Sequence, residues 1–284
     1  MKKPFALFGI CALAWLGTVV PAHAAGAKIV LIAGRPSHGP GEHEYNAGTK
    51  LLVECLGEIP GIDPVFVAGG WPQDEGAFRG AKSVVFFMDG GGRHPMIQGK
   101  RRIEAMRRLM DEGVGLVCLH YAVEFPKGEA GDQLLDWLGG YYEAHYSDNP
   151  HNTADIAPRE GHPITRGVKP FRINDEWYFK IRFRPDDPRV TPVLIARSLV
   201  GHDKATYTDQ VVGWATERKD GGRAFGFTGA HFHRNWGHAD FRKVVLNAIL
   251  WSAKLEVPPA GVRCDVGAED LQKNLDPKGR RKDR

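Results

Sequence analysis

The stretch Val-Gly-Leu-Val-Cys-Leu-His-Tyr occupies residues 114–121 and decides the fold class. Its first six residues are apolar throughout, which is typical of a strand buried on both faces in a parallel sheet. Gly113 precedes it and ends the stretch 97–111, in which apolar side chains recur at helical spacing opposite a row of lysines and arginines. A helix that leads directly into a buried strand is a basic unit of α/β folds.

The same alternation extends from this unit in both directions. Short apolar runs predict three further strands, at 28–33, 64–67 and 83–88. Helical spacing predicts helices at 44–56, 133–138 and 239–253, and further strand candidates lie at 153–156, 193–196, 211–215 and 224–228. The sequence therefore predicts an α/β protein with a mostly parallel central sheet, covered by helices on both faces.

The first 24 residues have the features of a secretory signal peptide. Lys2 and Lys3 precede an almost wholly apolar run over 5–20, and Ala22-His23-Ala24 offers a cleavage motif. The apolar run is short for a membrane span. We expect cleavage after Ala24, a periplasmic or secreted location, and no integral membrane segment in the mature chain.

The mature chain is predicted to form one domain, residues 25–257, followed by a tail over 258–284 that is partly disordered and basic at its end. The whole chain has a formal net charge of +4, and much of the excess lies in the tail, so the folded part is nearly neutral. Such a balance excludes a nucleic-acid surface, which needs a basic face. No glycine-rich phosphate loop occurs in the sequence, so nucleotide binding has no support.

Cysteine spacing indicates neither a disulfide framework nor a metal site. The mature chain keeps Cys55, Cys118 and Cys264, an odd number without a close pair. Cys55 and Cys118 lie in apolar surroundings, so both are predicted to be small core residues.

Histidines follow four of the predicted strands, at the sheet edge where open α/β proteins bind ligands. His38 follows the first strand, His94 the third, His120 the fourth and His231 the strand at 224–228. A histidine in a loop is also commonly a solvated or capping residue. The shared placement at one edge nevertheless predicts a polar pocket there.

Carboxylates and aromatic rings complete the predicted site. The stretch Asp175-Glu176-Trp177-Tyr178 combines two acids with two aromatic residues. This combination suits a sugar, whose C–H groups pack on aromatic faces and whose hydroxyls donate to carboxylates; a strand start with a buried tryptophan fits the same residues. We predict His120, His231 and Glu176 to be catalytic. The residues predicted to bind substrate are His38, Tyr121, Trp177, His233, Trp236 and His145.

A metal site is an alternative interpretation of the same histidines. Several histidines with a carboxylate can bind zinc or another divalent ion. His231-x-His233 places two side chains on one face of an extended segment. The sequence holds no His-Glu-x-x-His pattern, however. We therefore assign no metal ligands and no cofactor from the sequence.

An ordered set of short motifs runs through the chain between about residues 28 and 253. The motifs are Ser37-His38, GLVCLHYA at 115–122, HPITRG at 162–167, DEWY at 175–178, Gly222-Arg223, GAH at 229–231 and AILW at 248–251. Together they resemble the trehalose-utilisation, or ThuA-like, family of the class I glutamine amidotransferase-like superfamily. The resemblance implies a flavodoxin-like three-layer sandwich and a link to the catabolism of trehalose and related disaccharides through 3-keto sugars.

The resemblance also bears on the turn after 114–119. In the true amidotransferases of this superfamily a nucleophilic cysteine occupies that turn, whereas here the turn carries His120 and Cys118 falls inside the strand. The resemblance therefore implies that the chain is not a glutamine amidotransferase. The signal peptide and basic tail depart from the family's usual cytoplasmic members, which leaves the substrate open.

The sequence favours an exported enzyme that acts on a glycoside or keto-sugar by histidine acid–base chemistry. A ketone at C3 makes the neighbouring C–H group acidic, so His120 and His231 would drive elimination or isomerisation. A non-catalytic carbohydrate-binding module and a metal-dependent hydrolase are the alternatives. The sequence leaves the reaction class and the oligomeric state open.

Overall fold

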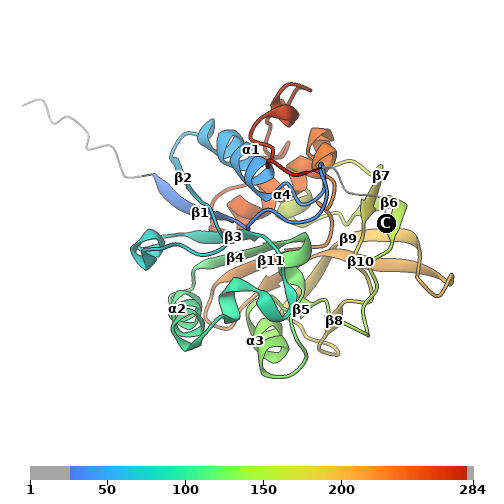
Figure 1. Cartoon of the computed structure of the whole chain (residues 1–284), viewed down its shortest axis with the longest axis horizontal. Coiled ribbons are helices and arrows are strands. Elements are labelled where there is room, and N and C mark those ends of the chain that lie inside the picture. The colour runs from blue at the N-terminus through green and yellow to red at the C-terminus, as the bar shows by residue number, and fades with distance from the viewer. Residues whose placement is uncertain (1–25, 280–284) are drawn as a thin grey trace, which may run out of the picture.

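A mixed sheet of nine strands forms the centre of the molecule, in a computed structural model that describes residues 26–279 (Figure 1). The predicted signal peptide, residues 1–24, lies outside the described residues. The strand order is β2-β1-β3-β4-β11-β10-β9-β6-β7. The strands span Ala27–Ala33 (β1), Ile62–Val67 (β2), Ser83–Phe87 (β3), Gly115–Leu119 (β4), His151–Pro158 (β6), Phe171–Glu176 (β7), Val190–Val200 (β9), Thr206–Glu217 (β10) and Arg223–Phe227 (β11).

The half of the sheet from β2 to β11 is parallel, as its continuous apolar runs predict. Every residue of β4 is buried, and this strand pairs with β3 on one side and β11 on the other. Consecutive residues of β1 point into two different cores, because side chains alternate along a strand. The predicted α/β fold with a mostly parallel sheet core is confirmed.

Four helices cover the two faces of the sheet (Figure 1). Helices α1 (Tyr45–Gly57) and α4 (Ala239–Ser252) pack on one face, and α2 (Lys100–Asp111) and α3 (Glu129–Trp137) on the other. Helix α2 ends as predicted at Gly113, whose left-handed backbone (φ 70°) lets its N–H reach the carbonyl of Met110 at 2.8 Å.

The other half of the sheet, from β10 to β7, is antiparallel. The predicted strands at 153–156, 193–196 and 211–215 form the central parts of β6, β9 and β10, while β7 is an additional strand. Because four successive pairs are antiparallel, β7 again runs in the direction of β4, and its carboxyl end reaches the same edge of the sheet. A separate two-stranded sheet joins β5 (Gly140–Tyr141) to β8 (Arg182–Phe183).

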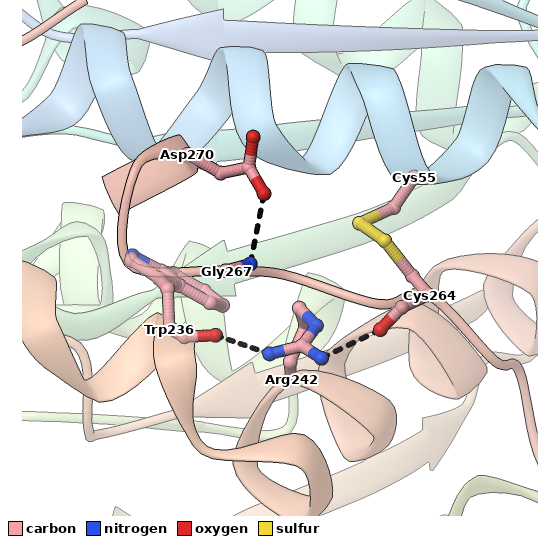
Figure 2. The surroundings of a disulfide bond; sticks show 6 residues. All are labelled: Cys55, Trp236, Arg242, Cys264, Gly267 and Asp270. Atoms are coloured by element: carbon pink, nitrogen blue, oxygen red, sulfur yellow. Dashed lines mark hydrogen bonds between the residues drawn. A yellow bond between two sulfur atoms is a disulfide. The ribbon is translucent and has the colours of Figure 1, made fainter. Parts of the chain in front are cut away.

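A disulfide joins Cys55 of α1 to Cys264, which lies beyond α4 (Figure 2). The prediction of unpaired cysteines is therefore wrong: the two residues are 209 positions apart in sequence, and only the folded chain brings their Cα atoms to 5.4 Å. Arg242 of α4 donates hydrogen bonds to the carbonyls of Trp236 and Cys264, which fixes the segment that carries Cys264 (Figure 2). Within 26–279, the helices are too short or too polar to cross a membrane.

Candidate functional site

Three histidines and a glutamate converge at the carboxyl edge of the sheet, and we call them the histidine cluster. His43 lies just before α1, His120 follows β4, Glu176 ends β7 and His231 lies in the loop after β11. His43 Nε2 is 3.0 Å from His120 Nε2 and 2.9 Å from His231 Nδ1. Glu176 Oε2 is 3.3 Å from His120 Nε2 and 3.2 Å from His231 Nδ1. Segments far apart in sequence therefore meet at one point.

The backbone at the cluster adopts the left-handed region repeatedly. His43 has φ 46°, His120 has φ 53° and Ala230, just before His231, has φ 93°. An alanine with such a φ is an outlier, and backbone strain of this kind gathers at functional sites. The turn at His120 aims its side chain across the end of the sheet directly after the buried strand β4.

Two loops carry His43 and His231 and support each other. The His43 N–H donates to the His231 carbonyl at 2.9 Å, and the His233 N–H donates to the Gly41 carbonyl at 2.9 Å. An isolated antiparallel bridge joins Glu42 to Phe232 between these bonds. The position of His43 therefore depends on a pairing that forms only in the folded chain.

The carboxylate of Asp175 anchors the loop that carries His231 by accepting hydrogen bonds from its backbone. It is fully buried, and its oxygens accept hydrogen bonds from the N–H groups of Ala230 at 2.7 Å and His231 at 3.0 Å. These bonds stabilise the strained backbone before His231 and tie that loop to the end of β7, next to Glu176.

The outward-facing ring nitrogens of His43 and His120 have polar partners, whereas His231 Nε2 is buried without a hydrogen bond. His120 Nδ1 lies 2.9 Å from the carbonyl oxygen of Thr228. His43 Nδ1 lies 2.7 Å from Tyr45 Oη and 3.3 Å from Asp89 Oδ1, which itself accepts hydrogen bonds from Tyr45 and Ser37. Burial alone would raise the pKa of Asp89, but the hydrogen bonds from His43, Tyr45 and Ser37 outweigh it and lower this pKa to about 2.

Burial and charge set the ionisation of the cluster. Burial lowers the pKa of His43 to about 3, so its imidazole is neutral at pH 7. Burial would also lower the pKa of His120, but the contact with the Glu176 carboxylate raises it overall. The pKa of Glu176 falls well below its usual range, because contacts with His120 and His231 outweigh the effect of burial. Glu176 is therefore a carboxylate at neutral pH.

The mouth of the cluster is formed by His38, Tyr121 and Glu124. The His38 ring is exposed to solvent, and its centroid lies 3.7 Å from that of the His43 ring. Tyr121 is half-buried, and its ring centroid lies 6.4 Å from that of His38. Burial, together with the charge of Glu176, raises the pKa of Glu124 to about 7. Glu124 can thus exchange protons around neutral pH.

A polar cleft lies beside the cluster. It has a volume of about 380 Å³ and shares Asp89 with the surroundings of His43. Its walls include Arg35, Arg93 and Arg102, whose guanidinium groups donate hydrogen bonds to oxygen acceptors. A polar ligand with several oxygens fits this lining.

The structure gathers five of the predicted site residues around His43: His38, His120, Tyr121, Glu176 and His231. The remaining predicted site residues lie elsewhere. Trp177 and Trp236 are fully buried in the core against Phe241, His233 is buried, and His145 is exposed. The two tryptophans are therefore core residues: their rings pack on Phe241 and are not accessible to a ligand.

Sequence reasoning omitted His43 and Asp89 from the predicted site. His43 sits in Glu42-His43-Glu44, just before the first helix, and Asp89 follows β3 directly. Their positions in the sequence could have indicated the site, since both residues come after strands that end at the same sheet edge as His120.

Cys118 does not take the place of a nucleophilic cysteine. It lies inside β4 and is fully buried, and this burial raises the pKa of its thiol. A reactive cysteine needs an accessible thiolate. The turn that follows β4 offers His120 instead.

Solved structures with the same fold include two ThuA-like proteins. The protein of Bacteroides uniformis has a TM-score of 0.59 at 16% identity, over 82% of this chain and 94% of that one. The protein of Parabacteroides merdae has a TM-score of 0.58 at 15% identity, over 82% of this chain and 92% of that one. At these identities the likeness shows the fold alone. No curated protein matches the chain significantly.

A family model described as trehalose utilisation matches residues 74–252. The matched region contains His120, Glu176 and His231, whereas His43 lies before it. This match covers more than half of the chain and agrees with the fold of the two ThuA-like structures. The chain therefore belongs to the ThuA, or trehalose utilisation, family.

Proposed function

We propose that the chain is an exported enzyme that acts on a glycoside or keto-sugar at the histidine cluster. The observation that carries the proposal is the convergence of His120, His231 and Glu176, which are buried or nearly so, beside the accessible ring of His38. The pKa values of His120 and Glu176 are both shifted by their contact, and such groups gather at functional sites. The family's description as trehalose utilisation supports a sugar as the substrate.

The reaction class that fits best is proton transfer next to a sugar carbonyl. A ketone at C3 acidifies the adjacent C–H bond, so removal of that proton begins an elimination or an isomerisation. His120 is fully buried, which leaves His38 and Glu124 at the mouth as the groups that reach the substrate's protons. The arginines of the adjoining cleft would donate hydrogen bonds to the sugar oxygen, on which negative charge develops.

The proposed export rests on the N-terminal signal and receives support from the disulfide. Lasting disulfides form in the periplasm and outside the cell, whereas most cytoplasmic proteins keep their thiols reduced. The Cys55–Cys264 bond fits the oxidising setting. Fractionation of cells that express the full chain, with and without residues 1–24, tests the location directly.

Turnover of 3-keto-trehalose by the mature chain tests the activity. We expect His120→Ala to lower kcat/KM by about 10²–10⁴-fold, the usual range for loss of acid–base and positioning groups. His202→Ala is the matched control, because its side chain is 67% exposed and lies outside the cluster.

Equal rates for wild type and His120→Ala would show that the histidine cluster takes no part in the reaction. Binding of the sugar in a calorimeter without any turnover would favour the carbohydrate-binding module instead. Trehalose itself serves as the second substrate, which separates action on the keto-sugar from action on the unoxidised disaccharide.

A further inference from the structure

We infer that His43, His120, His231 and Glu176 together bind one divalent transition-metal ion that favours imidazole nitrogen, such as Zn²⁺. Each residue offers one ligand atom, and these atoms lie within 4.8 Å of one another. Sets of imidazole nitrogens with one carboxylate are typical of zinc and related ions.

The outward contacts assign a proton to the far nitrogen of two rings. His120 Nδ1 faces the Thr228 carbonyl at 2.9 Å, and a carbonyl oxygen only accepts, so this nitrogen carries the proton. His43 Nδ1 faces Tyr45 Oη and Asp89 Oδ1, and the Tyr45 hydroxyl already donates to Asp89. His43 Nδ1 therefore donates as well.

A histidine binds a metal ion through a neutral ring, and with the protons on the outward nitrogens the inward nitrogens of both rings carry lone pairs. His43 Nε2 and His120 Nε2 then face each other at 3.0 Å without a proton between them. Glu176 Oε2 adds a negative charge 3.3 Å from His120 Nε2. A single proton placed on one ring would satisfy only part of this group, because four possible ligand atoms lie within 4.8 Å of one another. A divalent cation satisfies all of them at once.

The separations match what one ion requires. With metal–ligand bonds of about 2.0–2.1 Å, the corners of a tetrahedron lie about 3.3 Å apart. In the cluster, the distances from His43 Nε2 and from Glu176 Oε2 to the ligand nitrogens of His120 and His231 are 2.9 to 3.3 Å. Small outward shifts of the side chains would therefore suffice to seat the ion.

The outer partners resemble those of established metal sites. Ligand histidines donate their second N–H to a carboxylate or a backbone carbonyl, which fixes the ring and raises its basicity. Asp89 and Thr228 serve His43 and His120 in this way, and Glu42 Oε1 lies 3.9 Å from His231 Nε2. A second candidate set, His38, His43 and Asp89, is less suited, since Asp89 already accepts from Tyr45 and Ser37.

Metal titration of the mature chain, expressed without a histidine tag and stripped with a chelator, tests this inference. We expect calorimetry with Zn²⁺ alone to give about one ion per chain, with no comparable binding of Mg²⁺, which prefers oxygen ligands. His231→Ala and Glu176→Gln should each weaken the affinity at least tenfold, since even loss of an outer partner costs about that much.

His202→Ala is the control and should bind Zn²⁺ as wild type does, because its side chain is exposed and lies outside the cluster. Thermal melting adds a second measurement: Zn²⁺ should raise the Tm of wild type and His202→Ala, and much less that of Glu176→Gln. If His231→Ala does not fold, Glu176→Gln carries the comparison.

A wild-type chain that binds neither Zn²⁺ nor Mn²⁺ nor Co²⁺ stoichiometrically would overturn the inference. Equal Zn²⁺ affinity in wild type and both cluster variants would do the same, because the ion would then sit elsewhere. The inference does not depend on the proposed activity. Metal binding without turnover of sugar counts against the activity alone, and turnover unaffected by the chelator counts against a catalytic ion.

Discussion

At the scale of single residues, the placement of His231 depends on Asp175. Its carboxylate is fully buried and accepts hydrogen bonds from the N–H groups of Ala230 and His231, where the backbone is strained. A third N–H, that of Glu176, also donates to it at 2.9 Å. Asp175 touches no ligand atom of the cluster, so we regard it as a positioning residue.

We expect Asp175→Asn to destabilise the fold by about 2–3 kcal/mol, because the new amide N–H₂ would face backbone donors in a buried place. The variant should also bind Zn²⁺ more weakly, because the loop before His231 loses support. Urea unfolding and the Zn²⁺ titration measure the two effects. Asp155→Asn, at an exposed ion pair with Arg172, is the control, and equal losses in the two variants would contradict the role of Asp175.

Residues at strand ends were predictable from the sequence, and residues placed by tertiary contacts were not. His120 directly follows a predicted strand, so its position along the chain implies the site edge, whereas the sequence points to Glu176 through the acid and aromatic residues beside it. His43 lies in a loop that is held by pairing with the loop of His231, and no local pattern reports that pairing. Trp177 stands beside the acids in sequence, yet its side chain packs on Phe227 in the core. Its burial depends on neighbours from other elements.

At the scale of elements, strands of the parallel half of the sheet have a stronger sequence pattern than β7 at the end of the antiparallel half. Strands β3 and β4 are continuous apolar runs, because helices cover both of their faces. Strand β7, Phe-Arg-Ile-Asn-Asp-Glu, carries charged and polar residues and lies at the sheet edge, so it has no such run. It nevertheless ends in Glu176, which the sequence indicates through its acid and aromatic neighbours and not through a strand pattern.

Helix α1 is tied to the segment after α4 by the Cys55–Cys264 bond, which closes a loop of 209 residues. We expect the double variant Cys55→Ser/Cys264→Ser to lose about 3–5 kcal/mol in the free energy of unfolding, since a long loop gives the unfolded chain much entropy to regain. Urea unfolding of the oxidised wild type and the variant measures the loss. Reductant should lower the Tm of wild type and leave that of the variant unchanged; equal stability of the two proteins would refute the expectation.

At the scale of the whole molecule, the C-terminal segment packs against the loop that carries His43. The Lys278 side chain is almost fully buried, its ammonium group lies 3.3 Å from Glu44 Oε1, and it donates to the carbonyl oxygen of His43 at 3.1 Å. The Asp276 N–H donates to the second oxygen of Glu44 at 2.9 Å. The tail thus contributes to the order of the site, although it lies outside the matched family region.

Lys278→Ala should therefore weaken Zn²⁺ binding, because it removes the ammonium group that contacts the loop before α1. The buried Glu44 carboxylate would then lack its positively charged partner. We expect a loss of about 3–5 kcal/mol in stability as well, as for other buried ion pairs that lose one member. Zn²⁺ titration and urea unfolding measure both. Lys273→Ala removes an exposed lysine of the same segment and serves as the control; identical behaviour of the two variants would contradict the role of Lys278.

The disulfide also has a consequence for how the chain is made. Cys55 is synthesised 209 residues before Cys264, and at about 5–20 residues per second the interval is roughly 10–40 s. Throughout that time Cys55 lacks its partner, while every strand of the sheet after β1 and the cluster residues His120, Glu176 and His231 are synthesised. A chain that stops before residue 264 keeps this thiol in addition to that of Cys118, so the number of thiols that react after denaturation distinguishes unfinished chains from complete ones.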